Sequence, residues 1–175
     1  MLSNLVLTVI SEDKPGVVEA ISRVVKDNNG NWLESQLSHL AGKFAGVISL
    51  QVAAESEAKL IADLRQLNER KINIIIDNSP GAAAASDGKR LDFRVWGPDR
   101  AGIVKEIATT FAQYNINVEK LNTRISSMPY SGEPLFEADG TLTLPSGLNQ
   151  SELEDKLDEI EDTLAIDISL QTREE

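Results

Sequence analysis

Apolar and polar positions divide the first half of the chain into strands and helices. Mostly apolar runs at residues 5–10 and 72–76 predict two strands, since short runs of this kind suit a buried strand. Residues 31–40 and 43–53 predict two more, joined by an Ala-Gly turn. Stripes with the period of an amphipathic helix predict one helix marked by Val17, Ile21, Val24 and Val25 and another marked by Leu60, Leu64 and Leu67.

The second half of the chain repeats this order of elements. Apolar and polar residues alternate over residues 91–95, which predicts a half-buried strand, and further strands are predicted at 117–126, 135–144 and 166–170. A loop at 127–134 is longer than its counterpart in the first half. Helical stripes in this half are formed by Ile103, Ile107 and Phe111 and by Leu153, Leu157 and Ile160.

The two halves align at an offset of 86 residues, which places Gly16 on Gly102 and Asn31 on Asn117. Each copy has the order βαββαβ, the split βαβ plan of a ferredoxin-like fold. We therefore predict an α+β protein with two ferredoxin-like domains, each an antiparallel four-stranded sheet with two helices on one face. The first domain is predicted at 1–77 and the second at 90–175, with a linker rich in Ala, Gly and Ser at 78–89.

Composition narrows the function classes. The chain has 28 acidic and 17 basic residues, a net charge of −11, which argues against direct binding to nucleic acid or to an anionic membrane. It has no cysteine and one histidine, His39, so we expect no disulfide, no metal site and no cofactor. The acidic residues of the last helix are interpreted as a solvated face, so no catalytic residue is predicted. We expect a cytoplasmic protein, with no membrane span.

A turn between the first strand and the first helix is written twice, as Asp-Lys-Pro-Gly-Val-Val and as Asp-Arg-Ala-Gly-Ile-Val. Pro15 suits the first position of a helix, and Asp13 and Asp99 could cap the two helices. The alternative is a ligand site. The free N–H groups of a helix start bind a carboxylate, and a nearby aspartate binds an ammonium group, so the turn could hold a zwitterionic amino acid.

These turns, the helices that follow them, and the strands that open with Asn-Trp and Asn-Val resemble ACT domains, which are small-molecule-sensing modules that often bind amino acids. The tandem arrangement, together with the extended loop at 127–134 and the strand after it, resembles the glycine cleavage system transcriptional repressor family. The resemblance implies that a ligand sits where two modules meet, with the turn from one and an asparagine from the other. Asp13 would then pair with Asn117, and Asp99 with Asn31. The ligand-binding residues implied are Ser11, Asp13, Pro15, Gly16, Val17, Asn31, Gly97, Asp99, Ala101, Gly102, Ile103 and Asn117.

The resemblance also implies a function. It indicates a non-enzymatic regulator that senses an amino acid, with glycine as the expected ligand, and that controls glycine cleavage genes by binding a DNA-binding activator. The alternative is an amino-acid-binding regulatory subunit of a metabolic enzyme. Met128 and Tyr130, in the long loop, are the predicted contacts to a protein partner. Exposed edge strands predict a homo-oligomer, either a dimer or a tetramer.

Overall fold

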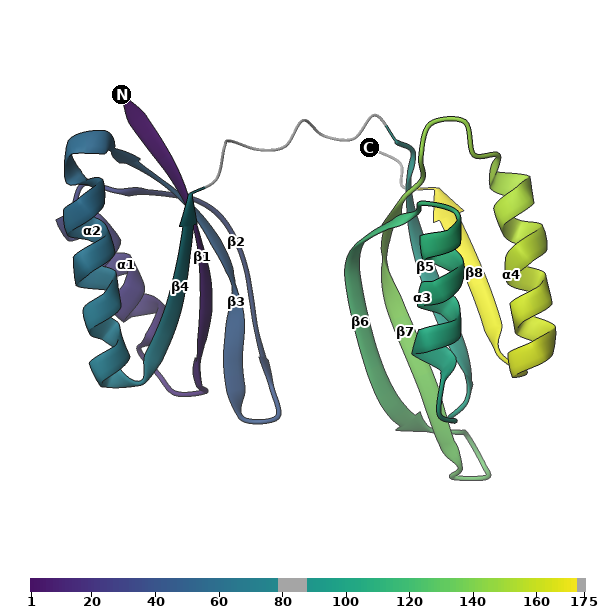
Figure 1. Cartoon of the computed structure of the whole chain (residues 1–175). Coiled ribbons are helices and arrows are strands. Elements are labelled where there is room, and N and C mark those ends of the chain that lie inside the picture. Colours follow the sequence, from purple (N-terminus) through teal and green to yellow (C-terminus); the bar gives the residue numbers. More distant parts are fainter. Residues whose placement is uncertain (79–87, 173–175) are drawn as a thin grey trace. The chain divides into compact units, whose positions relative to one another are not determined.

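A computed structural model describes residues 1–78 and 88–172, and the chain divides into two compact units, Met1–Ala83 and Ala84–Glu175. Each unit contains one antiparallel sheet with two helices against one of its faces (Figure 1). Most of the predicted linker, residues 79–87, lies outside the described residues. The predicted fold class, two ferredoxin-like βαββαβ domains, is confirmed.

The first domain follows the predicted order of elements. Its strands and helices are β1 (Leu2–Glu12), α1 (Val17–Asp27), β2 (Asn31–Leu40), β3 (Lys43–Ala53), α2 (Ala54–Gln66), a 3₁₀ turn (Leu67–Arg70) and β4 (Ile72–Asn78). The sheet order is β2-β3-β1-β4, so β2 and β4 form its edges.

The second domain repeats that topology. Its elements are β5 (Arg90–Pro98), α3 (Ile103–Gln113), β6 (Asn117–Ser127), β7 (Pro134–Thr143), α4 (Gln150–Leu164) and β8 (Asp167–Thr172). The order β6-β7-β5-β8 makes β6 and β8 the edges.

Each domain has a hydrophobic core between its sheet and its helices. In the first, Leu5, Leu7 and Ile48 are fully buried against α1 and α2 residues such as Ile21 and Leu60. The second core has the same construction, with Phe93 and Phe111 packed edge to face at 5.6 Å between ring centroids. Alternate residues of the central strands supply these cores, as the two-residue period of a strand dictates.

Two local predictions are wrong. Pro15 is not the first helical residue: α1 begins at Val17, after Gly16 with φ of 92°. Gly16 turns the chain just before the helix because its backbone is left-handed. Glycine can adopt this positive φ, and proline cannot. Leu67 keeps its place in the core but lies in the 3₁₀ turn rather than in α2, which ends at Gln66.

A β-bulge interrupts β2 and β6, one edge strand of each sheet, at equivalent positions. The register of β2 shifts between Trp32 and Glu34, and that of β6 shifts between Val118 and Lys120. A bulge leaves one extra residue on one strand and bends it. In β6 the extra residue, Glu119, accepts hydrogen bonds from the Thr143 hydroxyl and the Arg90 guanidinium, and so ties three strands together.

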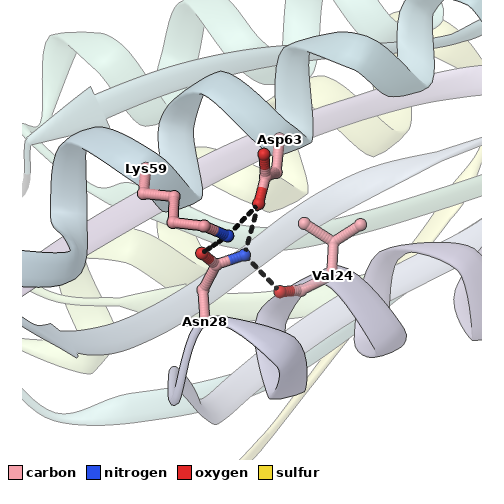
Figure 2. A network of polar contacts seen from close by, with 4 residues as sticks. All are labelled: Val24, Asn28, Lys59 and Asp63. Carbon is pink, nitrogen blue, oxygen red and sulfur yellow. Dashed lines mark hydrogen bonds and ion pairs between the residues drawn. The ribbon is translucent and has the colours of Figure 1, made fainter.

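A polar network joins the two helices of the first domain (Figure 2). The buried Asn28 amide donates to the Val24 carbonyl at 3.0 Å and to the Asp63 carboxylate at 2.9 Å. Lys59 donates to the Asn28 carbonyl oxygen at 2.8 Å and to Asp63 at 2.7 Å. The end of α1 is thereby fixed to the middle of α2.

Replacing Asn28 by alanine is expected to destabilise the first domain by about 1–3 kcal/mol, because it leaves polar partners unsatisfied at a buried position. The Ser22→Ala variant, which removes an exposed hydroxyl from the same helix, is the matched control and should stay within about 0.5 kcal/mol of wild type. Denaturant unfolding followed by Trp32 fluorescence, with Trp96 replaced by phenylalanine, measures both. Equal stabilities for the two variants would show that the network contributes nothing.

Hydrogen bonds from Lys59 and then from Asn28 lower the pKa of Asp63. A lowered pKa means that the ionised carboxylate is favoured in the folded domain, so its contribution is present above the unfolded-state pKa and is lost as pH falls through the folded-state pKa. We expect the stability gap between wild type and Asp63→Asn to narrow from pH 7 to pH 3. Denaturant midpoints at each pH provide the test, and a gap that is independent of pH would contradict it.

Candidate functional site

The repeated turn has the same geometry in both domains. Gly16 and Gly102 adopt φ of 92° and 102°, and α1 and α3 begin at the next residue. Among the described residues, no side chain caps the start of either helix with a hydrogen bond. The first three N–H groups of a helix have no partner within it, so each helix directs free donors outward. The interpretation of Asp13 and Asp99 as helix caps is therefore wrong.

Both aspartates are exposed, and each lies four positions before the first residue of its helix. In the first domain, Asp13, Gly16 and the first helical turn border an open hollow of about 500 Å³, which Phe44 also lines. Donors for a carboxylate and an acceptor for an ammonium group thus lie on one surface. Glu19, which also borders the hollow, is paired with Arg23 one turn further along the helix.

The backbone of each turn is hydrogen-bonded to the nearby hairpin. The Asp13 N–H donates to the Gly42 carbonyl, and the Asp99 N–H donates to the Pro134 carbonyl, both at 3.0 Å. Each turn is therefore connected at its aspartate to the closed end of the β2–β3 or β6–β7 hairpin.

The basic residue of each turn makes a long-range hydrogen bond that the sequence analysis did not predict. The Lys14 ammonium donates to the Arg70 carbonyl at 3.1 Å, and the Arg100 guanidinium donates to the Thr163 carbonyl at 3.0 Å. In both domains the cation thus binds a carbonyl at the end of the second helical segment, where a positive charge is favourable. The presence of a basic residue at the same position of both turns was the one sequence signal for this role. The carbonyl acceptors lie 56 and 63 residues away along the chain.

Other predicted site residues support the turn from within. Val17 and Ile103 are buried in the two cores, whereas Pro15 and Ala101 are exposed beside the glycines. Ser11 is 3% exposed, and its hydroxyl donates to the Glu12 carbonyl.

Gly97, the counterpart of Ser11, is buried for a steric reason. A Cβ atom at this position would lie 2.7 Å from the Ile166 side chain and 2.8 Å from its Cα. Gly97 is therefore required because the chain just before β8 passes close to it. Its role is to make room for Ile166.

Asn31 and Asn117 are exposed at the first positions of β2 and β6. Asn31 pairs with Gln51, which pairs with Asn4, so this row lies eight positions along β1 from Glu12 at the turn. At about 3.3 Å per residue the separation is roughly 26 Å. One domain alone does not bring its asparagine to its turn, and the pairing of each turn with the other domain's asparagine stays a prediction.

The hairpin residues proposed for partner contact differ from each other. The Tyr130 side chain is fully exposed at the tip of the β6–β7 hairpin, whereas Met128 is half-buried at its base. The part of the chain described by the structure contains no cluster of three or more metal-ligating side chains. None of the described helices has the length and apolarity to cross a membrane.

Comparison with known proteins gives a family match for the first domain and structural matches for the whole chain. Residues 3–75 match the family model of the ACT domain. A search of curated protein sequences gives no significant match. Among solved structures, an unknown protein from Galdieria sulphuraria shares the fold with a TM-score of 0.83 and 22% identity, covering 99% of this chain and all of that one.

A second structure, of a protein assigned as a glycine cleavage system transcriptional repressor, has a TM-score of 0.75 and 18% identity, covering 100% of this chain and 99% of that one. At these identities the two structures establish a shared fold over the full chain.

Proposed function

Because residues 3–75 match the family model of the ACT domain and the second domain repeats the fold of the first, we propose that this chain is a regulatory protein that binds a small amino acid, glycine first among the candidates, at the turns before α1 and α3. The observation that carries the proposal is the uncapped helix start beside an exposed aspartate, present in both domains. Helix donors suit the carboxylate of an amino acid, and the aspartate suits its ammonium group.

The proposed site uses the residues of the two turns together with the asparagines that open β2 and β6. Gly16 and Gly102 give the backbone its left-handed turn, and Asp13 and Asp99 supply the negative charge. Ser11, Gly97, Val17 and Ile103 shape the turns from the buried side. Pro15 and Ala101 differ at the exposed side, so the two sites need not have equal affinities.

Ligand size limits the affinity. Glycine has five heavy atoms, and a ceiling of about 1.5 kcal/mol per atom gives about 7.5 kcal/mol, which corresponds to a low micromolar Kd at best. Calorimetric titration with glycine, serine and alanine tests the proposal. Saturable binding in the micromolar to millimolar range, strongest for glycine, supports it, and the absence of heat from every amino acid contradicts it.

The regulatory output is proposed to be protein binding. The protein assigned as a glycine cleavage repressor shares this fold, and the net charge of −11 disfavours direct contact with DNA. We therefore propose that the chain binds a DNA-binding activator of the glycine cleavage genes through the hairpin that carries Met128 and Tyr130. Glycine must bind the free and the partner-bound protein with different affinities for the complex to respond.

Gel-shift titration with the activator, its operator DNA and this protein tests that output. Glycine should change the mobility of the activator complex, and Tyr130→Ala should weaken formation of the complex without altering the fold. An operator complex that is insensitive to both would contradict the proposal. Co-purification of a metabolic enzyme in place of a transcription factor would favour the regulatory-subunit alternative.

A further inference from the structure

The hairpins beside the two repeated turns are built differently. In the first domain Leu40 pairs with Lys43, and only Ala41 and Gly42 connect the strands. Both have positive φ, 49° and 77°, as the tightest class of hairpin turn requires. In the second domain Ser127 pairs with Pro134, and six residues, 128–133, form the connection. The equivalent hairpin is thus extended only in the second domain.

The extended loop of residues 128–133 is held by hydrogen bonds of its own. The Met128 N–H donates to the Glu133 carbonyl at 2.8 Å, and the Gly132 N–H donates to the Met128 carbonyl at 3.1 Å. The Glu133 N–H donates to the Ser131 hydroxyl at 3.3 Å. The loop therefore has a defined shape, and a loop that is ordered in advance loses less entropy when it binds a partner.

Tyr130 occupies the tip of this loop with φ of 71° and a fully exposed side chain. A left-handed backbone is uncommon for a residue with a bulky side chain. A fully exposed tyrosine is well suited to contact another protein, because tyrosine is among the residues enriched at the energetic centres of interfaces.

The base of the same hairpin is connected to the proposed ligand site. Pro134, the residue that closes the loop, accepts the hydrogen bond from the Asp99 N–H at 3.0 Å, while the Asp99 carboxylate is the proposed partner of the ligand ammonium group. Pro98 and Leu135 then pair in the sheet. Asp99 therefore provides the link to the loop and would also provide the proposed ligand contact.

We propose that the 128–133 loop is the output element of the second domain's site, a protein-binding loop whose order responds to the ligand at Asp99. The inference rests on the proposed function and adds its regulation. A ligand that holds the Asp99 turn strengthens the Asp99–Pro134 link and suppresses local opening of the hairpin. By reciprocity, a protein bound to the loop raises the affinity of this site for the ligand. The first domain has the same link through Gly42 but no loop to present.

Hydrogen exchange of the full-length protein, with and without saturating glycine, tests the inference. We expect glycine to slow exchange of the Met128, Gly132 and Glu133 amides about threefold or more. The protection should disappear in Asp99→Ala and persist in Asp13→Ala, which is the matched control in the other domain. Protection that survives Asp99→Ala, or that is lost in Asp13→Ala, would overturn the coupling.

A loop exchange separates the output role from ligand binding. Replacing residues 128–133 by the Ala-Gly turn of the first domain preserves the Ser127–Pro134 pair and the Pro134 carbonyl. This variant should bind glycine within about twofold of wild type, and a folded variant that no longer binds would show that the loop belongs to the ligand site instead. Calorimetric binding of glycine without protection of the loop overturns this inference alone, whereas absence of binding overturns the proposed function with it.

Discussion

Replacing Gly140 by alanine is expected to destabilise the second domain by about 3 kcal/mol or more, an unusually large effect for adding one methyl group. A Cβ atom there would lie 2.0 Å from the Lys120 carbonyl oxygen of β6 and 2.6 Å from the Phe93 ring. The first obstacle is backbone, so relief requires the edge strand to move away from β7. Gly46 has the same role in the first domain, with the Gln36 carbonyl oxygen at 1.9 Å.

The matched control is Gly132→Ala, at a position with φ of 73° but no atom within 4 Å of the added carbon. It should cost about 1 kcal/mol, the price of a left-handed backbone alone. Denaturant unfolding followed through Trp96 reports the second domain, since Trp32 is in the first and can be replaced by phenylalanine. Similar stabilities for Gly140→Ala and Gly132→Ala would show that β6 does not approach β7 as closely as described.

Removing the carboxylate of a turn is expected to weaken amino-acid binding to that turn about 10- to 100-fold. A hydrogen bond to a charged group contributes about 1.5–3 kcal/mol, and each 1.4 kcal/mol is about a factor of ten in Kd. Calorimetry on Asp13→Ala and Asp99→Ala measures the two sites separately, because each variant leaves the other turn intact. Since neither carboxylate caps its helix, neither substitution should alter stability by more than about 0.5 kcal/mol.

Asp77→Ala and Asp155→Ala are the controls for lost charge, since each removes an exposed carboxylate from β4 or α4, outside the turns. They should leave glycine affinity within about twofold. Weakening as large as that of the turn variants would mean that general charge, rather than contact at the turns, determines the affinity.

Much of the fold follows from periodicity. The strands at Asn31–Leu40 and Lys43–Ala53 have the predicted bounds, because the Ala-Gly turn between them marks where one ends and the other begins. The end of α2 was missed because Leu67 continues the apolar stripe, although the backbone tightens there into a 3₁₀ turn. Burial does not distinguish these helix types.

The bulges and the basic residues show what single-sequence reasoning can miss. In β6 the apolar positions change phase between Val118 and Leu121, and this change was a usable signal for the bulge at Glu119. The bonds of Lys14 and Arg100 depend on carbonyls far away in sequence, so no local pattern specifies them. The sequence places an aspartate before each helix, but only the backbone geometry shows that the two helix starts have no side-chain cap.

Chemical-shift mapping of the ¹⁵N-labelled protein with glycine tests the central claim most directly. The account predicts that the largest shifts occur at the first amides of α1 and α3, which are those of Val17, Val18, Glu19, Ile103, Val104 and Lys105. They should saturate at the calorimetric Kd and weaken in the matching aspartate variant. Saturable shifts confined to other surfaces, or no shifts at millimolar glycine, would contradict the assignment of the turns as the amino-acid site.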